Sequence, residues 1–164
     1  MFEGKSVKIG LISDTHGFAA SIVGAVNAIP DADAWIHLGD LTSDADYLRR
    51  LTGVPVCSVS GNCDMSAENT EAVFTFENVR IFACHGHKYG VKYDNLRIKY
   101  RAEELGCGVA VYGHTHIPCI EMCGEILIIN PGSPSLPRGG MNKTVCLLTV
   151  NGRDVVPRFI NISK

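Results

Sequence analysis

The stretch VKIGLIS (Val7 to Ser13) is a short apolar run, and the polar residues DTHG (Asp14 to Gly17) follow it directly. A short apolar run bounded by turn residues is typical of a strand that is buried on both faces. The next segment, FAASIVGAVNAI (18–29), repeats its apolar residues at near-helical spacing. This stretch decides the fold class, because a buried strand followed by a helix begins a βαβ unit.

The same order repeats further along the chain. AWIHLG (34–39) predicts a second strand, SDADYLRRL (43–51) predicts a helix that Ser43 can cap, and VPVCSVSG (54–61) predicts a third strand. Because strands that alternate with helices form parallel sheets with right-handed crossovers, residues 7–61 predict a parallel sheet.

Strands dominate the second half of the chain. TEAVFTF (70–76) and VRIFACH (79–85) predict a hairpin around Glu77-Asn78, and DNLRIKYRAEELG (94–106) predicts a helix with Asp94 as its cap and Gly106 at its end. Further strands are expected at GVAVYG (108–113), CIEM (119–122), ILIIN (126–130), KTVCLLTV (143–150) and VVPRFIN (155–161), with turns at Gly124-Glu125 and Asn151-Gly152. No repeat or linker interrupts residues 1–164, so we predict a single α/β domain with two packed mixed β-sheets flanked by helices.

Composition and charge narrow the range of functions. The 164 residues are 46% hydrophobic and 20% charged, which is typical of a globular protein. The net charge of −2 argues against a stable nucleic-acid partner bound through phosphate neutralisation. No segment approaches the roughly 20 apolar residues of a membrane span, and the apolar stretch near the N-terminus is too short for a signal peptide. The seven cysteines are odd in number and include no CxxC pair, so we expect a cytoplasmic protein without a membrane partner.

Two histidines follow the apolar run GVAVY, in the segment GHTH (Gly113 to His116). On an extended chain, residues two apart point to the same side, so the rings of His114 and His116 are expected to converge on one place. Asp14, Asp40 and Asn62 also follow predicted strands. Because the carboxyl ends of strands in an open α/β sheet share one edge, we expect all these groups to meet there.

The residue types at this edge are typical of a metal site. Carboxylate, amide and neutral imidazole ligands suit manganese, iron, zinc or cobalt. The candidate ligands are Asp14, His16, Asp40, Asn62, His85, His114 and His116. Seven ligands exceed the three or four that a single zinc ion takes from a protein, so the sequence predicts two ions that share Asp40.

The ordered motifs DxH, GD, GNxD, HGH and GHTH resemble those of the calcineurin-like metallophosphoesterase superfamily, and the short length resembles its small YfcE-type phosphodiesterase family. The resemblance extends from Asp14 to about Arg138 and implies an α/β/β/α sandwich that hydrolyses a small phosphodiester with a water activated by two divalent metal ions. Manganese is the expected metal, and nickel, cobalt, zinc and iron are alternatives. By resemblance, one ion would be held by Asp14, His16, Asp40 and His116, and the other by Asp40, Asn62, His85 and His114.

The chain departs from many relatives at Cys63, where they carry a histidine that is thought to protonate the leaving group. A thiol with an ordinary pKa near 8.5 is a poor proton donor in its place, so the residue that protonates the leaving group stays open. The cysteine suggests substrates whose leaving groups depart without much help from an acid. The catalytic residues are expected to be Asp40, Asn62, Cys63 and His87, and His87 is also assigned to substrate contact. Arg138 is equally well explained as a contact to the phosphate of the substrate or as a surface residue without a function.

Several residues near the motifs allow a structural interpretation. His37 is expected to pack behind the site and to bond a ligand carboxylate, while Asp64 suits either the site or a turn. The basic residues between 88 and 101 suit a solvated helix face, or would steer anionic substrates.

Two functions compete with the phosphodiesterase. A non-catalytic protein-binding scaffold, like the retromer subunit of the same fold, is the main alternative, and the intact ligand set argues against it. A protein phosphatase of the superfamily is disfavoured, because its GD motif is followed by an arginine-containing DRG and this chain has GDLTSDAD. Strand edges can pair between subunits, which leaves a homo-oligomer open.

Overall fold

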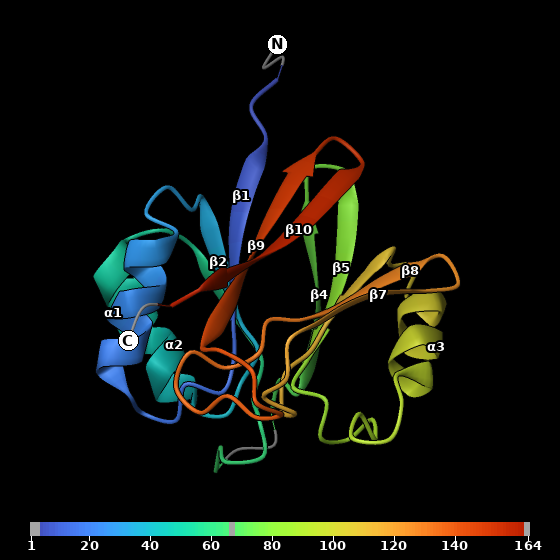
Figure 1. Ribbon diagram of the computed structural model, residues 1–164. Coiled ribbons are helices and arrows are strands. Elements are labelled where there is room, and N and C mark those ends of the chain that lie inside the picture. Colours follow the sequence, from blue (N-terminus) through green and yellow to red (C-terminus); the bar gives the residue numbers. More distant parts are fainter. Residues whose placement is uncertain (1–3, 66–67, 163–164) are drawn as a thin grey trace.

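The computed structural model describes residues 4–65 and 68–162, and its first half is the predicted βαβαβ unit (Figure 1). The elements are β1 (Val7–Ile12), α1 (Ala19–Ala28), β2 (Ala34–His37), α2 (Thr42–Thr52) and β3 (Val56–Ser58). Strands β1 and β2 pair in parallel, as do β2 and β3, which confirms the parallel sheet.

Two C-terminal strands complete this first sheet. β9 (Thr144–Asn151) pairs antiparallel with β1, and β10 (Asp154–Asn161) forms the edge, which gives the order β10-β9-β1-β2-β3. The turn between them was predicted one residue too early. Asn151 still pairs with Asp154, so Gly152 and Arg153 form the turn.

The second sheet is also mixed and has the order β4-β5-β6-β8-β7. The hairpins β4–β5 and β7–β8 are antiparallel, whereas β5, β6 and β8 run parallel. Its elements are β4 (Glu71–Phe76), β5 (Val79–Cys84), α3 (Leu96–Glu104), β6 (Val109–Val111), β7 (Cys119–Cys123) and β8 (Ile126–Asn130). The two mixed sheets predicted from the sequence are thus confirmed.

Three apolar clusters hold the layers together. Leu11 of β1 and Ile81 of β5 belong to the cluster between the two sheets. Ile12, the next residue of β1, packs with Ile22 of α1 on the other face of the first sheet, because successive strand residues alternate between faces. Ile98 of α3 belongs to a third cluster on the outer face of the second sheet. The layers are therefore helix, sheet, sheet and helix, as Figure 1 shows.

Two helix starts differ from the sequence prediction. Helix α2 begins at Thr42, so Ser43 lies inside it and does not cap it. The backbone N–H of Thr42 donates instead to Oδ1 of Asp64, at 2.7 Å. In α3, Asp94 does bond the first helical N–H, that of Leu96, at 3.0 Å, although it lies outside the cap position.

The two sheets place their functional ends together. Strands β1, β2, β5 and β6 all run toward the end of the sandwich that is lowest in Figure 1, and the long loop after β8 returns there too. At the opposite end, the backbone N–H of Asn78 donates to the carbonyl of Gly152 at 3.1 Å, which links the two hairpin turns. Within residues 4–65 and 68–162, no helix has the length and apolar character needed to cross a bilayer.

Candidate metal centre

The loops at this end of the sandwich have an unusual backbone. Among the described residues, seven that are not glycine have a positive φ angle. Five of them are predicted ligands, namely Asp14 (56°), His16 (50°), Asp40 (114°), His114 (68°) and His116 (60°). Such conformations cost an L-residue roughly 1–3 kcal/mol and gather at functional sites. The backbone therefore marks the same residues as the motifs.

One group of ligand atoms comes from three loops. Asp14, His16, Asp40 and His116 each offer one atom, and these four atoms all lie within 4.8 Å of one another. His16 Nε2 lies 2.8 Å from Asp40 Oδ2 and 3.2 Å from His116 Nε2. His116 Nε2 is 3.3 Å from Asp14 Oδ1. The structure thus brings together the four residues of the first predicted metal position.

A second group adjoins the first. Oδ1 of Asn62 lies 2.8 Å from Nε2 of His85 and 3.1 Å from Nδ1 of His114. His85 Nε2 is also 3.7 Å from Asp14 Oδ1 and 3.9 Å from Asp40 Oδ1. All seven predicted residues therefore meet, and the two carboxylates lie where the groups touch.

Backbone carbonyls fix two of the imidazole rings. Nδ1 of His85 lies 2.7 Å from the carbonyl oxygen of Leu38, and Nδ1 of His116 lies 2.6 Å from that of Leu136. Because a carbonyl only accepts, both Nδ1 atoms carry the proton and donate it. Each Nε2 lone pair then faces the carboxylates, which is how a neighbouring acceptor orients a histidine ligand.

The donor atoms fit divalent cations. Oδ1 of Asp14 and Oδ1 of Asp40 are buried and accept no hydrogen bond from the described residues. A buried carboxylate oxygen without a partner is costly, and a cation would remove that cost. The oriented Nε2 atoms of His85 and His116 lie 3.7 and 3.3 Å from Oδ1 of Asp14, so the site combines negative charge with neutral nitrogen donors.

The protonation states agree with ligand roles. Burial raises the pKa of Asp14, but the adjacent His116 ring, the charge of His85 and the Ser13 hydroxyl together hold it below its usual value. Burial lowers the pKa of His114 to about 4, with the charge of His85 adding to the effect. A carboxylate and a neutral imidazole are the forms that bind metal near neutral pH.

Glycines let the GD and GN loops approach each other. A Cβ atom on Gly61 would lie 2.6 Å from the backbone nitrogen of Asp40, and one on Gly39 would lie 2.8 Å from the nitrogen of Gly61. Both distances are too short for any side chain, so backbone packs on backbone here. This contact places Asp40 and Asn62 beside the same histidine, His85.

The GHTH segment works differently from the prediction. Strand β6 ends at Val111, and both histidines lie in a left-handed backbone instead of an extended one. The expected extended geometry is therefore wrong, although both rings still reach the cluster of seven residues. His116 joins the group of Asp14, whereas His114 joins that of Asn62.

A buried network behind the first loop was missed in the sequence. Oδ2 of Asp44 accepts the Thr15 hydroxyl at 2.5 Å and the Gly17 N–H at 2.8 Å. His37 accepts the Gly39 N–H at Nδ1, at 3.2 Å, so its Nε2–H faces the Thr15 hydroxyl at 3.0 Å. His37 is indeed buried behind the site, but it bonds Thr15 and not a ligand carboxylate.

The end of β8 and the loop after it donate hydrogen bonds to the loop that carries Asp14 and His16 and to the loop that carries His114 and His116. Nδ2 of Asn130 donates to the carbonyl of Gly113 at 3.0 Å. Ser133 donates to the carbonyl of Asp14, and Ser135 to that of Thr15, both at 2.9 Å. All three side chains are buried, at 0–9% exposure. The run of prolines and serines in this loop gave no signal for these contacts.

The remaining candidates lie around the second group. Cys63 is exposed, and its hydrogen bond to Asp40 together with partial burial raises its pKa to about 11. The ring of half-buried His87 lies 5.4 Å from that of His85 and 6.2 Å from that of His114, and burial lowers its pKa. Arg138 is exposed, and its backbone N–H donates to the carbonyl of His116 at 3.2 Å.

Asp64 has a structural role. In addition to binding Thr42, its Oδ2 accepts the Gly61 N–H at 2.7 Å. It therefore ties the GN loop to the start of α2, which decides the open question in favour of the turn.

Residues 7–153 match the family model described as the calcineurin-like phosphoesterase superfamily domain. The chain belongs to this superfamily. The probable metallophosphoesterase YsnB of Bacillus subtilis is 35% identical over 151 residues, covering 91% of this chain and 88% of the relative. The phosphodiesterase YfcE of Escherichia coli K12 is 32% identical over 159 residues, covering 82% of this chain and 83% of the relative. The resemblance noted in the sequence is confirmed.

Solved structures confirm the sandwich of the superfamily. A predicted phosphoesterase from Streptococcus pneumoniae TIGR4 superposes with a TM-score of 0.81 at 26% identity, covering 96% of this chain and 91% of that chain. Vps29 of Chaetomium thermophilum superposes with a TM-score of 0.73 at 19% identity, covering 96% and 98%. At that identity the second likeness concerns the fold alone.

Proposed function

We propose that this chain is a metal-dependent phosphodiesterase with two divalent ions per active site. The observation that carries the proposal is the meeting of two ligand groups at Asp14 and Asp40, each with a buried oxygen that accepts no hydrogen bond within the described chain. One ion would be held by Asp14, His16, Asp40 and His116, and the other by Asp40, Asn62, His85 and His114. Manganese is the expected metal, with nickel, cobalt, zinc and iron as alternatives.

When bound, such a pair of ions lowers the pKa of a water molecule and neutralises the charge of a phosphoryl group. The contribution of the protein is to hold the ligand atoms in position. The carbonyls of Leu38 and Leu136 hold His85 and His116 in the tautomer that leaves Nε2 free. The strained loops keep these donors in position before any substrate arrives, so little reorganisation is needed during the reaction.

The leaving group would receive its proton from a weak acid. The raised pKa keeps the Cys63 thiol protonated near neutral pH, so it retains a proton but gives it up reluctantly. His87 lies beside the second ligand group and is the other candidate donor and substrate contact. Both features favour diesters whose leaving group needs little help. Arg138 is a further candidate for contact with the phosphate, because its backbone adjoins His116.

The alternative is a protein-binding scaffold, which the Vps29 neighbours keep in view because they share the fold. The meeting of all seven candidate ligands, with their buried carboxylate oxygens, favours the enzyme. We also propose that residues 1–164 act as one domain, since the ligands are drawn from both sheets.

Metal content of the two GHTH variants tests the proposal. The purified chain, loaded with Mn²⁺, should approach two equivalents by elemental analysis. His116→Ala should lose mainly the ion shared with His16, and His114→Ala mainly the ion shared with Asn62. Asp40→Asn should weaken both, while Asp46→Asn, an exposed carboxylate on α2, serves as the matched control.

Turnover of bis(4-nitrophenyl) phosphate should fall by orders of magnitude in each of the three site variants. The ligands are expected to act as one unit, so the loss of any one of them removes most of the activity. Melting temperatures in chelator should change little, which separates loss of metal from loss of fold. A value of one equivalent or fewer, or full activity in either histidine variant, would refute the two-ion proposal.

A further inference from the structure

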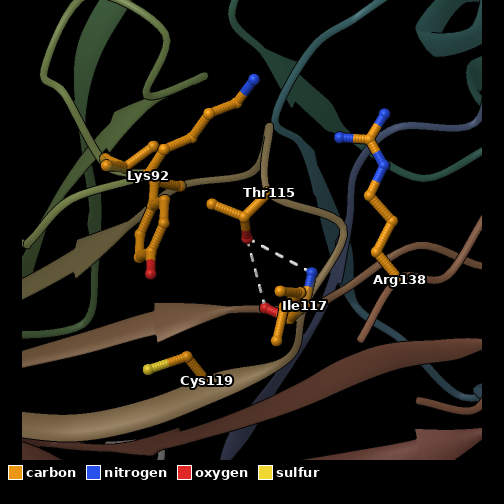
Figure 2. A pocket seen from close by; sticks show the side chains of 7 residues that line it. Lys92, Thr115, Ile117, Cys119 and Arg138 are labelled. Atoms are coloured by element: carbon orange, nitrogen blue, oxygen red, sulfur yellow. Dashed lines mark hydrogen bonds between the residues drawn. The ribbon is translucent and has the colours of Figure 1, made fainter. Parts of the chain in front are cut away.

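A pocket of about 490 Å³ is lined by residues of the loop that carries His114 and His116, and Figure 2 shows its side chains. Thr115, which lines it, stands between His114 and His116 in the same loop. Arg138, on another side of the pocket, is bonded through its backbone to the carbonyl of His116. The volume is within the usual range for a small-molecule site. A group bound here would therefore lie next to a phosphate held at the ligand cluster.

Two cationic side chains border this pocket. Lys92 and Arg138 lie on opposite sides of Thr115, and their charged ends extend beyond it in the same direction (Figure 2). Both residues are exposed, and across residues 4–65 and 68–162 no carboxylate lies within 4.0 Å of either charge. The pocket thus has two positive charges that form no ion pair with the described part of the chain.

Other cations nearby are already paired. Lys99 lies 2.9 Å from Glu103, and Arg101 lies 2.7 Å from Glu71. In the basic stretch, Lys99 and Arg101 are thus paired with carboxylates, Arg97 lies over the ring of Tyr89, and Lys92 lines the pocket. The sequence left two interpretations of these basic residues, a solvated helix face or a group that attracts anions. The first suits the residues on α3, and the second suits Lys92.

The wall of the pocket is apolar. Val91 and Tyr112 are buried, at 7% and 3% exposure, and Ile117 adds an aliphatic surface. Burial raises the pKa of Tyr112 to about 12, so its hydroxyl stays neutral and adds no charge. Flat apolar walls with charges only at the border suit an aromatic or heterocyclic ring whose polar substituent points outward.

We propose that this pocket binds the second arm of the phosphodiester and selects an aromatic or heterocyclic arm that carries its own anionic group, bound by Lys92 and Arg138. The inference rests on the proposed function for its reaction, but the pocket and its charges can be tested without turnover. A carboxylate and a phosphate group share the required chemistry, so both are included in the test.

The first experiment compares three 4-nitrophenyl phosphodiesters that differ only in the other arm, which is phenyl, 4-carboxyphenyl or 4-phosphonophenyl. Because the leaving group is shared, the ratio of kcat/KM between an anionic arm and the phenyl arm reports recognition of the charge. We expect a ratio of about tenfold or more, since hydrogen bonds to charged groups contribute about 1.5–3 kcal/mol. The larger ratio of the two shows whether carboxylate or phosphate is preferred.

Lys92→Met and Arg138→Met should each lower this ratio several-fold, mainly through KM. Lys99→Met removes a cation of the same stretch that is paired with Glu103, and it should keep the wild-type ratio. A ratio near one in the wild type, or a ratio that none of the pocket variants changes, would overturn the proposal.

The second experiment separates a failure here from a failure of the proposed function. The methyl NMR signals of Ile117 and Val91 are followed while the full chain is titrated with phenylphosphonate, and with benzyl alcohol as the neutral counterpart. We expect saturable shifts with phenylphosphonate that are about tenfold weaker in affinity in Lys92→Met and Arg138→Met. Shifts that persist unchanged in both variants, or no shifts at all, would refute the pocket even if the chain hydrolyses diesters.

Discussion

Replacement of Asp44 by alanine should loosen the loop that carries Asp14 and His16. The Asp44 side chain is only 7% exposed, and one of its oxygens accepts the Thr15 hydroxyl and the Gly17 N–H. Neither donor is a candidate metal ligand, but Thr15 lies between Asp14 and His16, and Gly17 directly follows His16 in the same loop. Asp44 is therefore a positioning residue, and its loss should reach the metal centre indirectly.

The size of the effect follows from the exposure of the two donors. Thr15 is fully buried, so its hydroxyl would lose a charged acceptor without gaining water, at a cost of about 2–3 kcal/mol. Gly17 is exposed, so its N–H can turn to solvent at little cost. We expect the free energy of unfolding to fall by about 2–3 kcal/mol in total. Affinity for Mn²⁺ should fall about 10- to 100-fold, as for other residues that orient metal ligands.

Asp46→Ala on the same helix is the matched control. Asp46 is exposed and pairs with Arg49 at 2.5 Å, an i,i+3 surface pair whose loss should cost no more than about 0.5 kcal/mol. Urea denaturation in chelator gives the stability change, and a Mn²⁺ titration of the folded chain gives the affinity. If Asp44→Ala behaves like Asp46→Ala in both assays, the network behind the loop does not position the ligands.

Three further changes give distinct outcomes. Cys63→His should accelerate hydrolysis of diesters with poor leaving groups more than those with good ones, by up to ~10²-fold, and equal acceleration in steady-state assays would contradict a role for the proton donor. Gly113→Ala places a Cβ 1.9 Å from the hydroxyl oxygen of Ser13, so it should cost about 1–3 kcal/mol by urea denaturation, whereas Gly108→Ala meets nothing within 4 Å and should be nearly neutral. Burial lowers the pKa of His37 to about 4, so the unfolded chain binds one more proton than the folded chain between pH 4 and 6.5. Stability should therefore fall by up to about 3 kcal/mol as the pH drops through this window, and His37→Gln should lose that part of the slope in denaturation midpoints at pH 5 and 7.

The strands, the parallel N-terminal unit and the first hairpin could be predicted because period and composition are local, whereas the order of the strands in the two sheets could not. The buried runs at 7–13 and 79–85 stand out against polar flanks, and both became strands. The turn after β9 was one residue off, because Asn151 suits a turn as well as a strand end. Local patterns fix the type of an element better than its last residue.

The ligands could be predicted from strand ends and from the motifs, but the residues behind them could not. Nothing in TSDADY distinguishes Asp44 from Asp46, since both are acidic residues near a helix start. Burial separates them, and burial depends on packing against a loop 27 residues earlier. Ser133 is a stronger case, because it bonds the carbonyl of Asp14 across 119 residues of chain.

The left-handed GHTH backbone was also beyond local prediction. Only a few per cent of residues other than glycine adopt a positive φ, and histidine does so more often than most, so the apolar run before GHTH suggested an extended segment but did not exclude a left-handed one. The turn is imposed by contacts from elsewhere, since the His114 N–H donates to Oδ2 of Asp14 at 2.9 Å and Asn130 holds the carbonyl of Gly113. The arrangement of the candidate ligands is therefore set by tertiary contacts, even though the residues themselves can be identified in the sequence.

The positive φ angles at five ligand positions also bear on how such chains change over generations. A glycine at one of these positions would relieve backbone strain of about 1 kcal/mol or more, but it would also remove side-chain bonds such as the one from the His114 N–H to Asp14. A duplicated copy of the gene that no longer needed these side chains would be expected to accept glycine first where the lost bonds contribute least. Aspartate or histidine at all five positions is therefore what we expect in copies that still use the site.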